Sequence, residues 1–231
     1  MRLDNYLKNK YENYTRSQIQ DYIKRGLVSV NNEIITKTGF QVRDNDIVEL
    51  KDLIEYASRA AYKLEAAYNK LNLNFKNFKI LDVGSSTGGF TDFSIKAGAK
   101  LVYAYDVGTD QMVERLRSDK RVILNEQTNI LHVTPPKVDI VLIDVSFTSS
   151  KPILRHLIDA SNKFLVLIKP QFEVGFDYLV KGIVKNKKRV ATLLEDYMQL
   201  ARTLRLNVVD IFESGLPGKE GNIEYWLYLT K

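Results

Sequence analysis

Residues 80–91 read ILDVGSSTGGFT, an apolar run that passes through a glycine-rich loop into the start of a helix. A strand, a glycine-rich loop and a helix in this order are typical of the ligand-binding end of an α/β sheet. In the dinucleotide pattern G-x-G-x-x-G, the second glycine lets a pyrophosphate approach the backbone. Gly84 and Gly89 occupy the first and third positions, but Ser86 occupies the second. The loop therefore argues against NAD and for a cofactor without a pyrophosphate.

Apolar runs and helical stretches alternate along the rest of the chain. Strands are expected over residues 79–83, 101–105, 121–124, 138–143, 163–168, 206–212 and 225–229, and helices over 89–97, 110–117, 149–160 and 187–204. Buried runs separated by helices indicate a parallel, doubly wound sheet. The segment between the last two runs is too short for a crossover, so that pair should be antiparallel. The predicted fold class is α/β, a Rossmann-like seven-stranded sheet of the methyltransferase type.

Polar residues at the strand ends suit S-adenosylmethionine better than NAD. Asp82 can orient the loop and a methionine amino group, and Asp106 can bind two ribose hydroxyls. Asn129 or Thr128 can contact the adenine. The candidate cofactor-binding residues are Asp82, Gly84, Ser85, Ser86, Thr87, Gly88, Gly89, Phe90, Asp106, Asn129 and Asp144. The glycines alone would also fit any tight strand-to-helix turn.

Four further polar residues are candidate catalytic residues. Lys63 lies on a helix before the sheet, which Ser58 should cap and which should run to about Leu71. Asp144 and Lys169 end the fourth and fifth strands, and Glu224 begins the last one. If that strand inserts antiparallel beside the fifth, these three residues meet at one edge on strands ~4.8 Å apart. Ligands bind at this edge of open α/β sheets.

Residues 1–50 are expected to form a separate small α+β domain, followed by a linker over residues 51–58 and the larger domain over residues 59–231. Leucine and isoleucine at helical spacing predict two helices, of which Thr15 caps the second and Gly26 ends it. Strands are expected over residues 27–30 and 47–50, with a turn at Asn31-Asn32. So small a unit buries little surface alone.

The motifs of both parts resemble known families. Residues 2–4 (RLD), 16–17 (RS), Gly26 and residues 46–47 (DI) resemble the alpha-L RNA-binding motif. SRAAYKL at 58–64, DVGSSTGGFTD at 82–92, IDVSF at 143–147, KPQFE at 169–173 and GNIEY at 221–225 resemble FtsJ-like 2′-O-methyltransferases. The combination resembles the TlyA family, whose members have also been called haemolysins. The resemblance covers essentially the whole chain.

The resemblance implies an S-adenosylmethionine-dependent methyltransferase that modifies cytidine 2′-hydroxyls in ribosomal RNA. Its catalytic Lys-Asp-Lys-Glu tetrad would be Lys63, Asp144, Lys169 and Glu224. Lys169 would be the base, because the cation of Lys63 favours the neutral, proton-accepting form of its amine. The carboxylates would fix the two lysines. The positions of the chain ends match family members that act on 23S RNA alone, so 23S RNA is the expected substrate and 16S RNA the second candidate.

Ribosomal RNA or a ribosomal subunit is therefore the expected partner. The candidate phosphate contacts of the N-terminal domain are Arg2, Lys8, Lys10, Arg16, Lys24, Arg25 and Lys37. The domain is nearly neutral, with eight basic and seven acidic side chains in residues 1–50. We therefore expect recognition of RNA shape supported by a few cations.

The composition excludes several classes of protein. The 231 residues include no cysteine, which excludes disulfides, thiolate metal sites and a cysteine nucleophile. With only His132 and His156, no metal site is expected. Nothing approaches ~20 consecutive apolar residues, so no membrane insertion is expected. The N-terminus has no apolar segment typical of a secretory signal, and a cytoplasmic protein is expected.

The net charge of +6 includes one dense basic run, formed by Lys181, Lys185, Lys187, Lys188 and Arg189. On charge alone, a solvated helix start is the simplest interpretation. Three other functions remain as alternatives: a catalytically silent RNA-binding or ribosome-assembly protein, a membrane-active haemolysin, and an NAD-linked oxidoreductase. The complete tetrad argues against the silent RNA-binding protein, and the lack of a long amphipathic segment argues against the haemolysin. Ser86 argues against the oxidoreductase.

Overall fold

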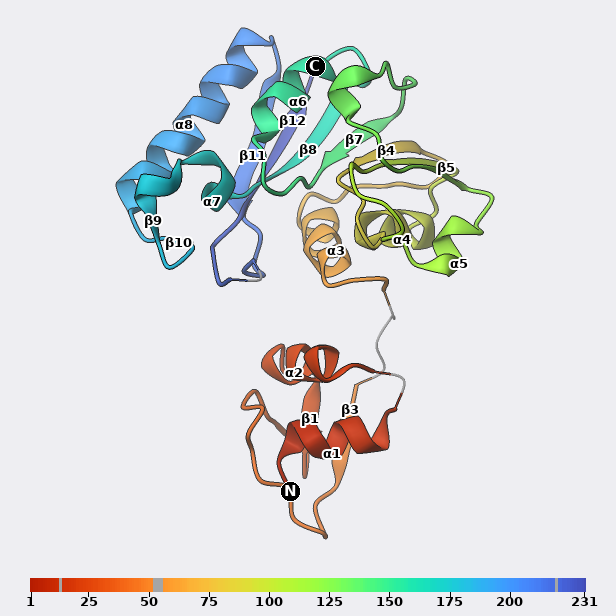
Figure 1. The fold of residues 1–231 in the computed structure, drawn as a ribbon, viewed down its shortest axis with the longest axis vertical. Helices are drawn as coiled ribbons and strands as arrows, with labels where there is room; N and C mark the ends of the chain where they lie inside the picture. The colour runs from red at the N-terminus through yellow and green to blue at the C-terminus, as the bar shows by residue number, and fades with distance from the viewer. Residues whose placement is uncertain (13, 52–55, 219) are drawn as a thin grey trace. The chain divides into compact units, whose positions relative to one another are not determined.

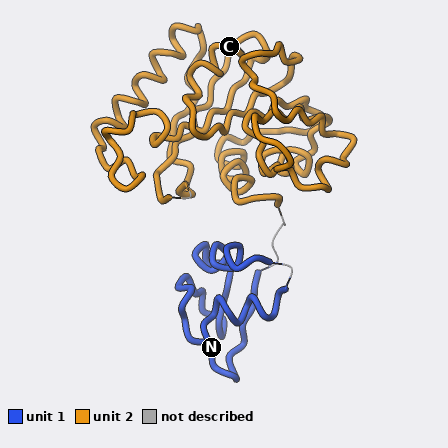
Figure 2. The backbone as a smooth tube through the Cα atoms, in the orientation of Figure 1, with its two compact units in different colours: residues 1–55 blue, residues 56–231 orange. Residues whose placement is uncertain are grey.

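The structure is a computed structural model that describes residues 1–12, 14–51, 56–218 and 220–231. The chain divides into two compact units, residues 1–55 (unit 1) and residues 56–231 (unit 2) (Figure 2). Of the predicted linker, residues 52–55 lie outside the described residues.

Unit 1 combines two helices with a small antiparallel sheet around one core. Its elements are α1 (Leu3–Lys10), α2 (Arg16–Lys24), β1 (Val28–Val30), β2 (Glu33–Ile34) and β3 (Val48–Leu50), with the strand order β2-β1-β3. Leu7 and Ile23 from the helices pack with Val30 from the sheet. Thr15 caps α2 as predicted, in a capping box in which Thr15 and Gln18 each bind the other's main chain.

Unit 2 contains a seven-stranded sheet in the order β11-β12-β8-β7-β4-β5-β6 (Figure 1). The strands are β4 (Lys79–Val83), β5 (Leu101–Tyr105), β6 (Val122–Asn125), β7 (Ile140–Ile143), β8 (Lys163–Ile168), β11 (Asn207–Glu213) and β12 (Tyr225–Thr230). β12 runs antiparallel between β8 and β11, and the pairs from β6 to β8 are parallel. The predicted sheet, including its final antiparallel strand, is confirmed.

Helices cover both faces of this sheet. They are α3 (Ala60–Lys70), α4 (Gly89–Lys96), α5 (Glu114–Arg117), α6 (Ser150–His156), α7 (Pro170–Glu173) and α8 (Lys187–Thr203), with short 3-10 helices at Ile130–His132 (η1) and Phe176–Tyr178 (η2). Leu64 of α3 and Phe93 of α4 share one core with Trp226. Leu154 of α6 and Leu200 of α8 belong to the core of the opposite face. Two covered faces explain why the central strands are apolar throughout.

Some predicted details were wrong. Helix α3 is capped by Arg59, not Ser58, and Arg59 makes no side-chain capping bond. Helix α5 begins at residue 114 and not 110, because Glu126 accepts the main-chain amides of Asp110 and Gln111 and Asp110 adopts φ +51°. Helix α6 ends at residue 156, and a turn follows. A short hairpin of β9 (Leu179–Val180) and β10 (Ile183–Val184) was not predicted, because two-residue strands show no periodicity.

Candidate active site

The loop after β4 packs directly against the end of β7. Gly84 has φ +87°, and a Cβ there would overlap the main-chain carbonyl of Asp144. Gly88 has φ +95°, and its Cβ would overlap the Leu116 side chain of α5. Both positions therefore require glycine. The same packing brings the glycine-rich loop into contact with the strand end that carries Asp144.

Asp82 is a buried carboxylate whose two oxygens differ in their hydrogen bonding. Its Oδ2 accepts a hydrogen bond of 2.6 Å from the Thr91 hydroxyl, whereas Oδ1 has no hydrogen-bond partner among the described residues. Burial raises the pKa of Asp82 to about 7, and the charges of Asp144 and Asp106 add to this effect. A buried oxygen without a donor costs free energy unless a ligand supplies one. The ammonium of S-adenosylmethionine is such a donor, so Asp82 fits the predicted cofactor.

Asp106 lies directly after β5, and its carboxylate clamps two loops. Oδ2 accepts the main-chain N–H of Ser86 at 2.8 Å, and Oδ1 accepts that of Gly108 at 2.7 Å. Asp106, the residue predicted to bind the ribose, therefore also holds the glycine-rich loop in place. Asn129, the predicted adenine contact, accepts the Leu131 amide at 3.0 Å and caps η1.

The other predicted cofactor residues differ in exposure. Ser85 is buried, and its hydroxyl makes no hydrogen bond with the described residues. Ser86 is exposed and donates to Gln111 Oε1 at 2.9 Å. Phe90 packs against Trp226 in the core, with ring centroids 5.6 Å apart. The Phe90 side chain is thus part of the core, and only its backbone is left for a cofactor contact.

The four candidate catalytic residues form two lysine–carboxylate pairs. Lys63 Nζ lies 2.6 Å from Glu224 Oε2, and both side chains are buried. Lys169 Nζ lies 2.6 Å from Asp144 Oδ1, and it also donates to the Ser146 hydroxyl at 3.0 Å. Ion pairs that are largely shielded from solvent are stable only when hydrogen bonds satisfy their remaining polar atoms. The structure thus assigns each lysine its own carboxylate.

The sheet brings three of these residues to one edge. Asp144 follows β7 and Lys169 follows β8, which are neighbours, and Glu224 precedes β12, whose first residue pairs with Ile168. Gln171 Nε2 donates to Glu224 Oε1 at 3.2 Å and so connects Glu224 to the segment that starts at Lys169. Lys63 reaches Glu224 from α3. The predicted juxtaposition is therefore present.

Residues that the sequence interpretation missed hold this edge together. Glu173 of α7 accepts bonds from the Ser149 hydroxyl at 2.7 Å, the Ser150 amide at 2.8 Å and the Tyr197 hydroxyl at 2.5 Å. Burial and the nearby Glu173 charge raise the pKa of Tyr197, so Tyr197 stays a donor. Gln171 and Glu173 both belong to the KPQFE motif, and their spacing from Lys169 was the available signal.

Several of the predicted RNA-binding cations form ion pairs or hydrogen bonds within unit 1. Arg2 and Arg16 pair with the buried carboxylate of Asp4 at 3.0 and 3.3 Å. The bond from Arg2 holds the pKa of Asp4 well below its usual range. Lys8 donates to the Glu12 carbonyl at 2.9 Å. The remaining candidates are Arg25, which pairs with Asp21 at 3.6 Å, Lys10, which donates to the Val48 carbonyl, and Lys24 and Lys37, which are exposed.

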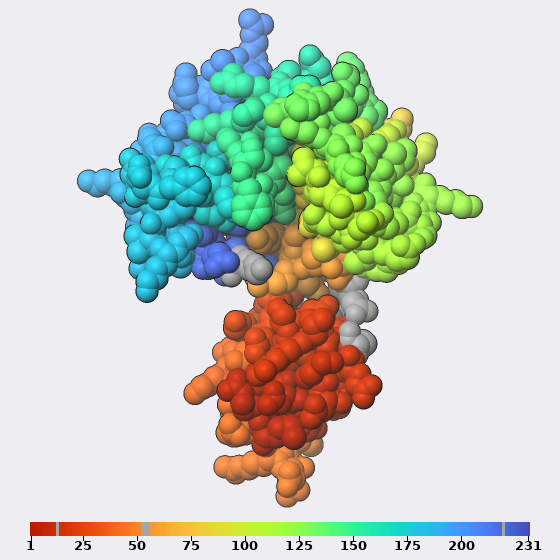
Figure 3. Space-filling model, in the orientation of Figure 1, coloured from red at the N-terminus to blue at the C-terminus, as the bar shows by residue number. Residues whose placement is uncertain are grey.

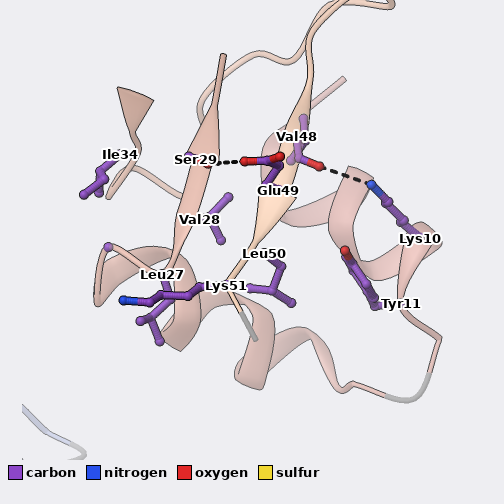
Figure 4. A pocket seen from close by; sticks show the side chains of 11 residues that line it. Lys10, Tyr11, Leu27, Val28, Ser29, Ile34, Val48, Glu49, Leu50 and Lys51 are labelled. Atoms are coloured by element: carbon purple, nitrogen blue, oxygen red, sulfur yellow. Dashed lines mark hydrogen bonds between the residues drawn. The ribbon is translucent and has the colours of Figure 1, made fainter. Parts of the chain in front are cut away.

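A hollow of about 520 Å³ lies on unit 1 (Figure 4). It is lined by Lys10, Tyr11, Gly26, Leu27, Val28, Ser29, Ile34, Val48, Glu49, Leu50 and Lys51. Its walls mix an exposed isoleucine and a tyrosine with both charge signs. Two lining residues belong to the predicted RNA-binding features: Lys10 is a candidate phosphate contact, and Gly26 is part of the alpha-L motif.

Within the described ranges, no group of three or more His, Cys, Asp or Glu side chains is arranged to hold a metal ion. Among the described helices, none combines the length and the apolar character needed to cross a bilayer.

Comparisons with known proteins agree with this architecture. The FtsJ-like methyltransferase family model matches residues 56–231, and the S4 domain model matches residues 1–48. Hemolysin A of Brachyspira hyodysenteriae is 36% identical over 97% of this chain and 98% of its own. The 16S/23S rRNA (cytidine-2′-O)-methyltransferase TlyA of Mycobacterium tuberculosis is 34% identical over 93% of this chain and 84% of its own. A solved structure of a hemolysin candidate from Streptococcus thermophilus has a TM-score of 0.75 at 36% identity, covering 100% of this chain and 88% of that one.

Proposed function

The chain belongs to the FtsJ-like methyltransferase family and carries an N-terminal S4 domain, and we propose that it methylates a ribose 2′-hydroxyl of ribosomal RNA with S-adenosylmethionine as methyl donor. The observation that carries this proposal is the pair of ion pairs, Lys63–Glu224 and Lys169–Asp144, beside the glycine-rich loop. Relatives named for cytidine-2′-O-methylation of 16S and 23S RNA support a cytidine as the target. We propose 23S RNA as the substrate, with 16S RNA second.

Cofactor binding is proposed to depend on Asp82, Asp106 and the loop between them. The unpaired Asp82 oxygen would accept from the cofactor's amino group, and Asp106 would bind its ribose while holding the Ser86 amide. When bound, S-adenosylmethionine supplies a methyl group on a positively charged sulfur. The chain must align a nucleophile with that methyl group and remove a proton.

Each residue of the tetrad is proposed to have a separate role in the reaction. Nζ of Lys169 would accept the proton of the substrate 2′-hydroxyl as that oxygen takes up the methyl group. Asp144 and Ser146 orient that nitrogen. Lys63, held by Glu224, would donate to the substrate ribose and position its hydroxyl. Gln171 keeps the Glu224 carboxylate in place.

The first prediction tests this assignment. Lys169→Ala should slow transfer of tritiated methyl groups to 23S ribosomal RNA by about 10²–10⁴-fold, because a positioned base is lost. Affinity for S-adenosylmethionine, measured by calorimetry, should remain nearly unchanged. Lys169→Arg should also be inactive, because a guanidinium does not lose its proton near neutral pH.

Lys70→Ala is the matched control, because it removes a lysine paired with a carboxylate, Asp210, at 3.7 Å on the surface. It should leave the rate unchanged. Rapid turnover by Lys169→Arg would show that residue 169 only positions the substrate. Absence of methyl transfer by the wild-type chain to free RNA and to ribosomal subunits would refute the proposed function itself.

A further inference from the structure

The basic run of residues 181–189 is a compact surface feature of unit 2. It occupies the β9–β10 hairpin and the first turn of α8, and Figure 3 shows this segment, coloured cyan, projecting from the surface. Its lysines are exposed, and Asp177 is the only acid in the chain between residues 174 and 194. The members are Lys181, Lys185, Lys187, Lys188 and Arg189.

Helix stability does not account for this run. Three of its cations, Lys187, Lys188 and Arg189, occupy the first turn of α8, which contains no acidic residue. Cations are unfavourable at that end of a helix because of its dipole, and repulsion among them adds to the cost. A local arrangement that opposes folding is expected at functional sites. An anionic partner would remove both penalties.

Exposed aromatic side chains adjoin the cations. Phe176 is 91% exposed, and Tyr178 is 42% exposed with the guanidinium of Arg189 5.0 Å above its ring. Exposed apolar side chains that gather in one patch are typical of an interaction site. A basic surface with interleaved aromatic rings is the combination that binds single-stranded nucleic acid, through phosphates and stacked bases.

The β9–β10 hairpin is held beside the edge of the sheet that carries the candidate catalytic residues Asp144, Lys169 and Glu224, here called the catalytic edge. Asn222 is 2% exposed, and its side chain donates to the Gly182 carbonyl at 2.8 Å and accepts the Val184 amide at 2.9 Å. Glu224 follows two residues later, and α7, which precedes the hairpin, follows Lys169. Figure 1 shows α7, the hairpin and the loop before β12 on the same side of the sheet.

We propose that the β9–β10 hairpin and the first turn of α8 bind the substrate RNA next to the methylated nucleotide, with Lys185, Lys187 and Lys188 on its phosphates and Phe176 stacked on an unpaired base. This inference rests on the proposed function and assigns its substrate-docking surface. The charge complementarity and the attachment to the Glu224 loop argue for RNA over other anionic partners.

The test compares two triple variants with equal charge change. Lys185→Gln/Lys187→Gln/Lys188→Gln should weaken binding to purified 23S ribosomal RNA at least tenfold in a filter-binding assay. The salt slope of log Kd should fall by about 2, since each lost phosphate contact on a single strand contributes ~0.7. The control Lys76→Gln/Lys100→Gln/Lys120→Gln alters exposed lysines that precede β4, β5 and β6 at the opposite edge. It should stay within twofold of wild type.

A second variant isolates the stacking. Phe176→Leu should weaken RNA binding about tenfold without changing the salt slope, while Phe176→Trp should retain it, because stacking needs an aromatic face. Equal binding and equal salt slopes for the two lysine triples would overturn the proposal. So would loss of binding to phosphatidylglycerol vesicles, and not to RNA, in the hairpin triple, since that result would assign the surface to a membrane.

The outcomes separate this proposal from the function on which it rests. Binding is measured without turnover, so the hairpin result stands even if wild-type protein transfers no methyl group. Conversely, normal methyl transfer with unaltered RNA affinity in the hairpin triple would overturn the docking surface alone. Calorimetry with S-adenosylmethionine should give wild-type affinity in both triples, which verifies that each variant is folded.

Discussion

At the scale of single residues, Asp82 has the buried, unpaired carboxylate oxygen expected of the cofactor-binding role proposed for it. Its buried oxygen has no donor among the described residues, and burial raises its pKa to about 7. Each unit of pKa shift corresponds to about 1.4 kcal/mol. The carboxylate therefore lowers the stability of the free enzyme once it ionises, and a bound ammonium would offset that cost. Such a conflict between stability and binding is common at active sites.

The raised pKa of Asp82 predicts how stability and cofactor affinity change with pH. An unfolded aspartate ionises near pH 4 and the folded one near pH 7, so the stability contributed by the protonated form is lost as the pH rises through that window. Asp82→Asn does not ionise, and it should gain stability relative to wild type between pH 5 and pH 8 in urea unfolding without cofactor. Its affinity for S-adenosylmethionine should be lower and should no longer rise between pH 6 and pH 7.5. A parallel pH dependence in variant and wild type would contradict this account.

At the scale of elements, short segments with little stability of their own position the proposed catalytic groups. Helix α7 has only four residues, and Glu173 anchors it to Ser149, Ser150 and Tyr197. The β9–β10 hairpin has two-residue strands and depends on the Asn222 side chain. Neither element buries enough surface to form alone. Their positions follow from a few partly buried hydrogen bonds, and losing one lowers stability.

The hairpin anchor can be tested directly. Asn222→Ala removes the hydrogen bonds to the partly buried Val184 amide and to the Gly182 carbonyl, at a cost of about 0.5–1.5 kcal/mol for each bond. Hydrogen exchange across residues 179–184 should accelerate, and methyl transfer should fall by tenfold or more with S-adenosylmethionine affinity unchanged. Asn74→Ala is the control, because it removes an asparagine whose side chain makes only an exposed local bond, to the Lys76 amide. Unchanged exchange in Asn222→Ala would remove the anchor role.

At the scale of the whole molecule, the two units have separate cores. The core cluster of unit 1 contains residues from Leu3 to Leu50, and the clusters of unit 2 contain residues from Tyr56 onwards. Each unit therefore buries its own apolar side chains, which predicts that each folds by itself. Every residue of the proposed cofactor and catalytic sites lies in unit 2. Unit 1 would then act on the substrate, by raising its concentration at the catalytic edge.

Truncation tests this division of labour. Residues 56–231 alone should bind S-adenosylmethionine with the affinity of the full chain. Methylation of 23S ribosomal RNA should collapse at low enzyme concentration and recover partly at high concentration and low salt, since tethering supplies effective concentration. Full activity of the truncated chain at all concentrations would show that unit 1 does not dock RNA.

The sequence by itself determined the sheet, its final antiparallel strand and the edge where Asp144, Lys169 and Glu224 meet, because strand periodicity and connection length are local properties of the chain. It also identified both domains and the capping of α2 by Thr15. Only the tertiary structure decided which carboxylate pairs with which lysine. Lys63 and Glu224 are 161 residues apart, and no local pattern encodes a contact that depends on packing between α3 and the start of β12. The unpaired oxygen of Asp82, the loop clamp of Asp106 and the Asn222 anchor depend for the same reason on where distant main-chain amides and carbonyls lie after folding.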